Sequence, residues 1–180
     1  MGLAPVLFGK VRSTSLGVVC CFADVDFSHC SRLSTAVIYV EGRRVLHTMH
    51  LFIVNPVAGK GHTLKIITEI EALMEKHSLP YQIAITETAG HATVIAKEYI
   101  EKNRNLRIYA VGGDGTLNEV LQGVVGSDAS LGIIPAGTGN DFIKSFCPIR
   151  DPLKLLPFLV HADSVPVDVC KLNDRYFLNI

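Results

Sequence analysis

The chain has 180 residues, of which 48% are hydrophobic and 19% are charged, and this is the composition of a globular protein rather than a disordered one. Its 17 basic residues balance its 17 acidic residues, so no global field attracts nucleic acid or an anionic membrane. No apolar run approaches the roughly 20 residues of a membrane-spanning helix. We therefore expect no nucleic-acid partner and no transmembrane segment.

The cysteines follow no paired spacing that predicts a zinc site, and their number, five, is odd. We interpret them as reduced thiols, which favours a cytoplasmic location. We expect Cys147 and Cys170 to be small core residues. The other three cysteines are Cys20, Cys21 and Cys30.

Residues 1–48 contain short apolar pieces without sustained helical or strand periodicity. We assign them no function and treat them as an N-terminal extension. A regular pattern begins at residue 49 and continues to residue 163, and we interpret this stretch as one domain.

Short apolar runs in this domain alternate with helical patterns of 10–15 residues. The predicted strands cover residues 51–54, 81–86, 107–111 and 131–134. Spacings of three and four predict three core-facing helical stripes between them: Leu64, Ile67, Ile70, Leu73 and Met74; Ala92, Ile95, Ala96, Tyr99 and Ile100; Leu117, Val120, Leu121 and Val124. The alternation predicts an α/β fold with a doubly wound, mainly parallel sheet, whose ligands bind at the carboxyl ends of the strands.

The last part of the chain predicts another helix and a β-hairpin. Asp151 and Pro152 are a favoured N-cap and first helical residue, and Leu153, Leu156 and Val160 would face the core. Residues 165–172 and 176–180 then predict two strands joined at Asn173-Asp174. Because an apolar sheet edge normally needs a cover, we interpret residues 164–180 as the start of a truncated, β-rich second domain.

A glycine-rich loop, Gly112 to Thr116, joins a predicted strand to a predicted helix. Glycines allow backbone N–H groups to converge on phosphate oxygens, and the helix N-terminus adds partial positive charge. An aspartate beside phosphate is repulsive unless Mg²⁺ or a proton lies between them, so Asp114 is a candidate metal contact or base. The alternative is a tight turn in which Asp114 caps the helix.

Two further loops follow strands in the same way, at residues 55–61 and 135–141. Neither matches the Walker A pattern, and no dinucleotide fingerprint occurs. The second loop has an alternative interpretation as a helix entry capped by Asn140 or Asp141. Thr86 offers a hydroxyl after the second strand, although a strand-end bond to the backbone is favoured by spacing alone.

These motifs, in this order, resemble the diacylglycerol kinase catalytic-domain family, especially its soluble bacterial lipid kinases. The resemblance is carried by four segments: Asn55-Pro56 with Gly59 and Gly61, Thr86 with Gly90-His91-Ala92, residues 112–120 and residues 132–142. It implies the NAD kinase/diacylglycerol kinase-like fold. The Gly-Gly-Asp-Gly-Thr segment by itself is shared with NAD kinases and sphingosine kinases.

The resemblance also implies a reaction, in which the γ-phosphoryl group of Mg-ATP passes to a lipid hydroxyl, with diacylglycerol giving phosphatidic acid in phospholipid biosynthesis. It implies that Asp114 is catalytic and contacts Mg²⁺. It also implies a cytoplasmic protein, peripheral at the membrane, that meets its lipid substrate at the membrane surface. Such a protein could form a homodimer. The implied ATP-binding residues are Asn55, Gly59, Thr86, Gly112, Gly113, Asp114, Gly115, Thr116, Asn118, Glu119 and Thr138.

Alternatives remain open at this point. Residues 1–48 are unlike the family pattern, and the family's second domain, with further metal ligands and an acidic base, is not found before Ile180. A catalytically incomplete nucleotide-binding fragment is therefore one alternative. A sphingosine kinase-like or NAD kinase-like enzyme is another, although the loop at residues 135–141 fits the lipid kinases better than NAD kinase.

Overall fold

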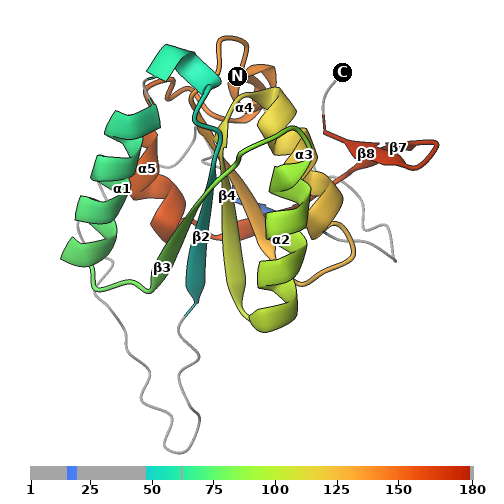
Figure 1. The fold of residues 1–180 in the computed structure, drawn as a ribbon, viewed down its shortest axis with the longest axis horizontal. Coiled ribbons are helices and arrows are strands. Elements are labelled where there is room, and N and C mark those ends of the chain that lie inside the picture. Colours follow the sequence, from blue (N-terminus) through green and yellow to red (C-terminus); the bar gives the residue numbers. More distant parts are fainter. Residues whose placement is uncertain (1–15, 20–47, 62, 179–180) are drawn as a thin grey trace, which may run out of the picture.

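The computed structural model describes residues 16–19, 48–61 and 63–178. Its main feature is a six-stranded sheet with the order β3-β2-β4-β5-β1-β6 (Figure 1). All neighbouring strands are parallel except β6, which is antiparallel to β1. The strands are β1 (Leu16–Val19), β2 (Met49–Val54), β3 (Tyr81–Ile85), β4 (Leu106–Gly112), β5 (Ser130–Pro135) and β6 (Ser164–Val167).

Helices lie on both sides of this sheet, and α1 packs with α5 while α2 packs with α3 (Figure 1). This confirms the predicted doubly wound α/β fold. No helix in the described part of the chain is both long and apolar enough to cross a membrane. The helices are η2 (Ala58–Gly61), α1 (Thr63–Lys76), α2 (His91–Lys102), α3 (Asp114–Val124), α4 (Asp141–Phe146) and α5 (Pro152–His161).

The core is centred on β2 and β4. Residues 51–54 of β2 and 108–111 of β4 are all completely buried. Central strands of a parallel sheet are covered on both faces, so they have continuous apolar sequences instead of alternating ones. This explains why Leu51 to Val54 could be recognised as a strand despite its lack of alternation.

The predicted helical faces agree with the structure to different degrees. In α3, all four predicted core residues are buried. In α1, the prediction omitted Ile66, which is buried, whereas Ile67 and Leu73 are only partly buried. In α5, Leu155 and Leu159 are buried and Leu153 is not. The α5 sequence is apolar on most of its circumference, so its spacing alone did not define the buried face.

Two predictions for the last part of the chain were wrong. Residues 165–172 form two strands instead of one: β6 pairs with β1 in the main sheet, and β7 (Cys170–Leu172) pairs with β8 (Arg175–Phe177) in a separate hairpin. A strand of residues 164–167 joins the main sheet because β1 offers it an edge, which the local sequence does not reveal. Cys170 is exposed on the hairpin, whereas Cys147 is buried as predicted.

Among the described residues of the segment 1–48, one short piece has secondary structure. Leu16–Val19 forms β1, which lies between β5 and β6. The three cysteines Cys20, Cys21 and Cys30 lie outside the described residues.

Candidate active site

Three loops meet at the carboxyl ends of β2, β4 and β5 and form a cleft of about 520 Å³. Eight of the predicted site residues line this cleft: Asn55, Gly59, Gly113, Asp114, Gly115, Thr116, Glu119 and Thr138. Four further residues also line it: Val57, Ala58, Gly137 and Gly139. The cleft has the position at which parallel α/β sheets bind ligands.

The loop after β2 is fastened to α3 by Asn55. Its side-chain Oδ1 accepts a hydrogen bond from the Val57 backbone N–H at 3.1 Å, which closes a local turn. Its Nδ2 donates to the Thr116 hydroxyl at 3.1 Å, and Thr116 is buried at the start of α3. Gly59 follows with φ +63°, a conformation that glycine adopts without strain. The hydrogen bond between Asn55 and Thr116 therefore fixes the loop after β2 against the start of α3.

The glycines of the loops after β4 and β5 differ in the space around them. A Cβ atom on Gly112 would overlap the Thr116 side chain, and a Cβ on Gly137 of the neighbouring loop would lie 2.6 Å from the Gly113 Cα. Gly112 is therefore required by the packing of the Thr116 side chain against its own loop, and Gly137 by the close approach of the loop after β5 to Gly113. A Cβ on Gly115, by contrast, would meet no atom within 4 Å. Packing within the described chain does not explain the absence of a side chain at Gly115, which lines the cleft.

The first residues of α3 form one wall of the cleft, and no side chain caps this helix at its N-cap, Gly113. A helix N-terminus presents backbone N–H groups and about half a positive charge, which favours an anion. The combination of this terminus with the open space at Gly115 is suited to a phosphate group.

One interpretation of the sequence was that Asp114 caps its own helix, α3, and the structure contradicts it. The Asp114 carboxylate accepts hydrogen bonds from the backbone N–H groups of Asp141, at 2.9 Å to Oδ2, and Phe142, at 3.1 Å to Oδ1. These are the first residues of α4, whose N-cap residue, Asn140, makes no side-chain capping bond. Asp114 thus caps α4 across the cleft. An ionised carboxylate offers about four acceptor positions, so each oxygen retains further acceptor capacity.

The loop after β5 is braced by Asn140, which adopts a left-handed conformation with φ +55°. Its side-chain amide exchanges two hydrogen bonds with the backbone of Gly137, with Oδ1 accepting at 3.2 Å and Nδ2 donating at 2.7 Å. This bracing leaves Thr138 and Gly139 exposed at the loop tip, beside the cleft. Asn140 therefore shapes the loop instead of capping α4 with its side chain.

Three predicted site residues do not line the cleft. Thr86 donates its hydroxyl to the Val54 carbonyl at 3.4 Å, which is the strand-end arrangement that its spacing favoured. Gly112 is buried beneath the loop. Asn118 lies on the flank of α3, where its Oδ1 accepts from the Leu178 backbone N–H at 3.4 Å.

Val57 is the cleft residue that sequence reasoning had least chance of finding. Its side chain is 84% exposed and lines the cleft, yet a single valine in a loop carries no sequence signal. Gly137 and Gly139 lie within the predicted loop at residues 135–141, so the repeated glycine was a usable signal for them.

The charged side chains described along the cleft, Asp114 and Glu119, are both acidic. Glu119 also accepts a hydrogen bond from Gly90 N–H at 2.9 Å, which fixes it beside α2. Two carboxylates repel a polyphosphate unless a cation lies between them, and Mg²⁺ is commonly held by one or two carboxylates together with substrate phosphates and water. No cluster of three or more metal-ligating side chains occurs among the described residues. The donor set therefore fits a metal that enters together with a phosphate ligand.

Residues 49–172 match the profile of the diacylglycerol kinase catalytic domain. The chain belongs to this family. The match begins in β2, ends in β7 and includes all three loops of the cleft. Membership in the diacylglycerol kinase family identifies the chain with a family of lipid kinases.

Individual relatives of the diacylglycerol kinase family support this assignment. The diacylglycerol kinases of Staphylococcus carnosus and Staphylococcus saprophyticus are 37% and 36% identical to the chain over 130 residues. These alignments cover 71% of the chain and 42% of each relative. The chain thus spans less than half the length of these curated relatives.

The fold is similar to that of a solved diacylglycerol kinase from Bacillus anthracis. The similarity has a TM-score of 0.65 at 29% identity, and it covers 76% of the chain and 52% of the Bacillus anthracis protein. A solved family member therefore has a fold similar to that of the chain.

Proposed function

We propose that the chain binds Mg-ATP in the cleft and transfers the γ-phosphoryl group to a lipid hydroxyl. The proposed acceptor is diacylglycerol and the product is phosphatidic acid, an intermediate of phospholipid biosynthesis. Family membership supports the lipid kinase class. The observation that carries nucleotide binding is the open space at Gly115, at the N-terminus of α3 and inside a cleft made by three loops.

In this proposal the backbone of residues 113–115 and the N-terminus of α3 bind phosphate oxygens. Thr138 and Gly139 approach the nucleotide from the opposite loop, and Gly59 approaches it from the loop after β2. Asn55 and Thr116 hold these loops together through the hydrogen bond between their side chains. Catalysis in phosphoryl transfer depends mostly on positioning and charge neutralisation, and loops fastened in this way meet the first requirement.

Asp114 and Glu119 are the residues proposed to hold Mg²⁺, with Asp114 as the catalytic contact. When bound, the ion would neutralise charge on the transferring phosphoryl group. Asp114 is kept at the cleft by its two hydrogen bonds to α4. Its negative charge is therefore fixed in position before any ligand arrives.

We also propose a cytoplasmic protein that meets its lipid at the membrane surface and is able to form a homodimer. In the proposed domain division, residues 49–163 bind the nucleotide and residues 164–180 begin a β-rich region. β6 belongs to the main sheet, and β7 and β8 form a separate hairpin that protrudes beside α3 (Figure 1).

Nucleotide binding can be tested by titration calorimetry with Mg-ATP on a pair of glycine variants. Gly115→Val places a side chain in the open space of the cleft, and we expect at least a tenfold loss of affinity because that space is the proposed phosphate site. Valine has a higher helix propensity than glycine, so the fold should persist.

The matched control is Gly126→Asn, which follows the opposite end of α3. Gly126 has φ +86° with no atom within 4 Å of a built Cβ, and asparagine tolerates this conformation. We expect its affinity to stay within twofold of the unmodified chain. Equal affinity for the unmodified chain and Gly115→Val would exclude the cleft as the ATP site.

A second candidate function is nucleotide binding without turnover. It is favoured by the alignments, which cover only 42% of the length of the two Staphylococcus relatives. We expect the 180-residue chain to phosphorylate diacylglycerol in mixed micelles at or near background. Labelled phosphatidic acid formed at about 1–100 s⁻¹, the usual range of kinases, would instead show that this chain contains its own acceptor site and base.

A further inference from the structure

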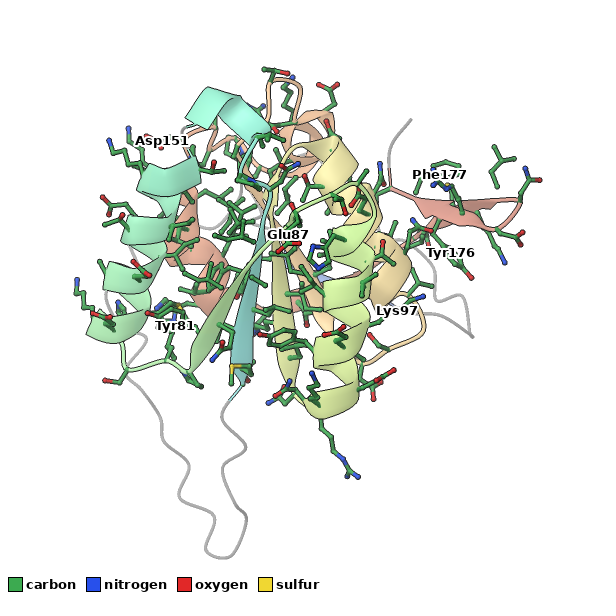
Figure 2. All side chains as sticks on the ribbon, viewed as in Figure 1. Tyr81, Glu87, Lys97, Asp151, Tyr176 and Phe177 are labelled. Carbon is green, nitrogen blue, oxygen red and sulfur yellow. The ribbon has the colours of Figure 1, made fainter. Side chains whose placement is uncertain are left out.

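The flank of α3 binds a strand through side-chain amides. Gln122 makes two hydrogen bonds to the backbone of a single residue in β8: its Oε1 accepts from Tyr176 N–H at 3.0 Å, and its Nε2 donates to the Tyr176 carbonyl at 2.7 Å. This is the pair of bonds that a neighbouring strand would supply. Figure 2 shows Tyr176 and Phe177 on this strand, beside α3.

One helical turn earlier, Asn118 binds the residue that follows β8. Its Oδ1 accepts from the Leu178 backbone N–H at 3.4 Å. Four residues of a helix advance about 6 Å, and two residues of a strand advance about 7 Å. Side chains at positions 118 and 122 therefore match the N–H groups of alternate strand residues. The Gln122 amide is held in place by a further bond from its Nε2 to the Asn118 carbonyl, at 2.8 Å.

The pairing defines the direction of β8. Gln122 lies nearer the C-terminal end of α3 and binds Tyr176, whereas Asn118 lies nearer the N-terminal end and binds Leu178. β8 therefore runs antiparallel to α3, toward the end of the helix that lines the cleft. Asp114 is one further turn along the same helix. A single rigid element thus carries the proposed phosphate site at its tip and the hairpin strand on its flank.

We infer that Asn118 and Gln122 are positioning residues, which fix β8 relative to the glycine loop of the cleft. Asn118 accordingly contributes to the reaction by holding the strand and does not contact the nucleotide. The inference rests on the proposed function for its role in the reaction, whereas the contacts themselves stand independently of it.

Amide hydrogen exchange of the 180-residue chain, followed by NMR, tests the contacts. Gln122→Met keeps the length of the side chain without its amide, and we expect exchange at Tyr176 to rise at least tenfold. Asn118→Leu should raise exchange at Leu178 to a similar degree. Asn118→Asp keeps the acceptor oxygen and should restore protection of Leu178 to nearly that of the unmodified chain, which a loss of general stability would not do.

Mg-ATP titration of the same variants separates this inference from the proposed function. We expect Gln122→Met to bind Mg-ATP within twofold of the unmodified chain. Unchanged exchange at Tyr176 in Gln122→Met would overturn the inference, as would a tenfold loss of affinity in Asn118→Leu with unchanged exchange at Leu178. If the unmodified chain binds no Mg-ATP, the proposed function fails, and the exchange data still decide whether the two amides hold β8.

If Gln122→Met does not fold, Gln122→Leu provides the same decision, because leucine also lacks the acceptor for Tyr176 N–H. A rise of at least tenfold in exchange at Tyr176 supports the inference, and unchanged exchange contradicts it.

Discussion

Polar side chains at the two ends of the parallel sheet differ in their exposure and in their partners. At the carboxyl ends, the polar side chains of the cleft are half-buried or exposed, except for the buried Thr116, and Gly115, with no atom within 4 Å of a built Cβ, lines the same space. Toward the amino ends, His50 of β2 is 3% exposed, and a 3.1 Å hydrogen bond joins its Nδ1 to the hydroxyl of the fully buried Tyr109. Polar groups in the cleft can bind a ligand, whereas these two satisfy each other within the core.

Aromatic packing reinforces the buried pair. The His50 and Tyr109 rings stack with centroids 5.8 Å apart, and the Tyr109 ring stacks on Phe52 at 4.7 Å. Burial raises the pKa of Tyr109 to about 12. Burial, and secondarily the charges of Arg107 and His161, lower the pKa of His50 to about 4. Both groups are therefore neutral at pH 7, and this end of the sheet is specialised for stability.

The comparison predicts that removing a side chain at the buried end is far more costly for stability than altering the cleft. Tyr109→Ala should lower the free energy of unfolding by about 3–5 kcal/mol, because it deletes a completely buried ring. Gly115→Val in the cleft should change it by less than about 1 kcal/mol. Urea denaturation of both variants measures this difference, and similar losses would show that the cleft is as tightly packed as the core.

The buried histidine predicts a dependence of stability on pH. The pKa of His50 falls from 6.5 in the unfolded chain to about 4 in the folded chain, so the unfolded state binds more protons between these values. The contribution of neutral His50 to the free energy of unfolding is therefore complete above about pH 6.5, and it is lost as the pH falls toward 4. At pH 5 the loss is about 2 kcal/mol relative to pH 7.5.

His50→Gln removes this titration and provides the control. Its free energy of unfolding should fall less than that of the unmodified chain between pH 7.5 and pH 5, by about 2 kcal/mol. Chemical denaturation at the two pH values gives the comparison. Parallel losses in both proteins would mean that His50 titrates normally in the folded state.

A smaller effect is expected for Asp114, a cleft residue that also has a structural role. Asp114→Ala removes the carboxylate that caps α4 and should cost about 1 kcal/mol, with faster amide exchange at Asp141 and Phe142. Asp114→Asn keeps one acceptor oxygen and should protect one of these amides better. If neither amide changes in Asp114→Ala, the carboxylate does not hold the two loops together.

The sequence by itself determined the α/β fold, the order of β2, β3, β4 and β5 with α1, α2, α3 and α5, and the loops that form the cleft. It did not predict η2, and it offered the start of α4 only as an alternative interpretation of the loop at residues 135–141. The predicted features are local in origin. Periodicity at Leu117, Val120, Leu121 and Val124 defined the buried face of α3, and loops that follow parallel strands necessarily meet at one edge of the sheet.

Only the tertiary structure decided which partner each side chain and strand takes. Asp114 caps α4 instead of α3, Asn118 binds Leu178 just after β8, and residues 164–167 pair with β1. In each case the partner is more than 25 residues away in sequence. Residue type and spacing state what a group can bind, but not which distant group the packed fold brings within hydrogen-bonding distance.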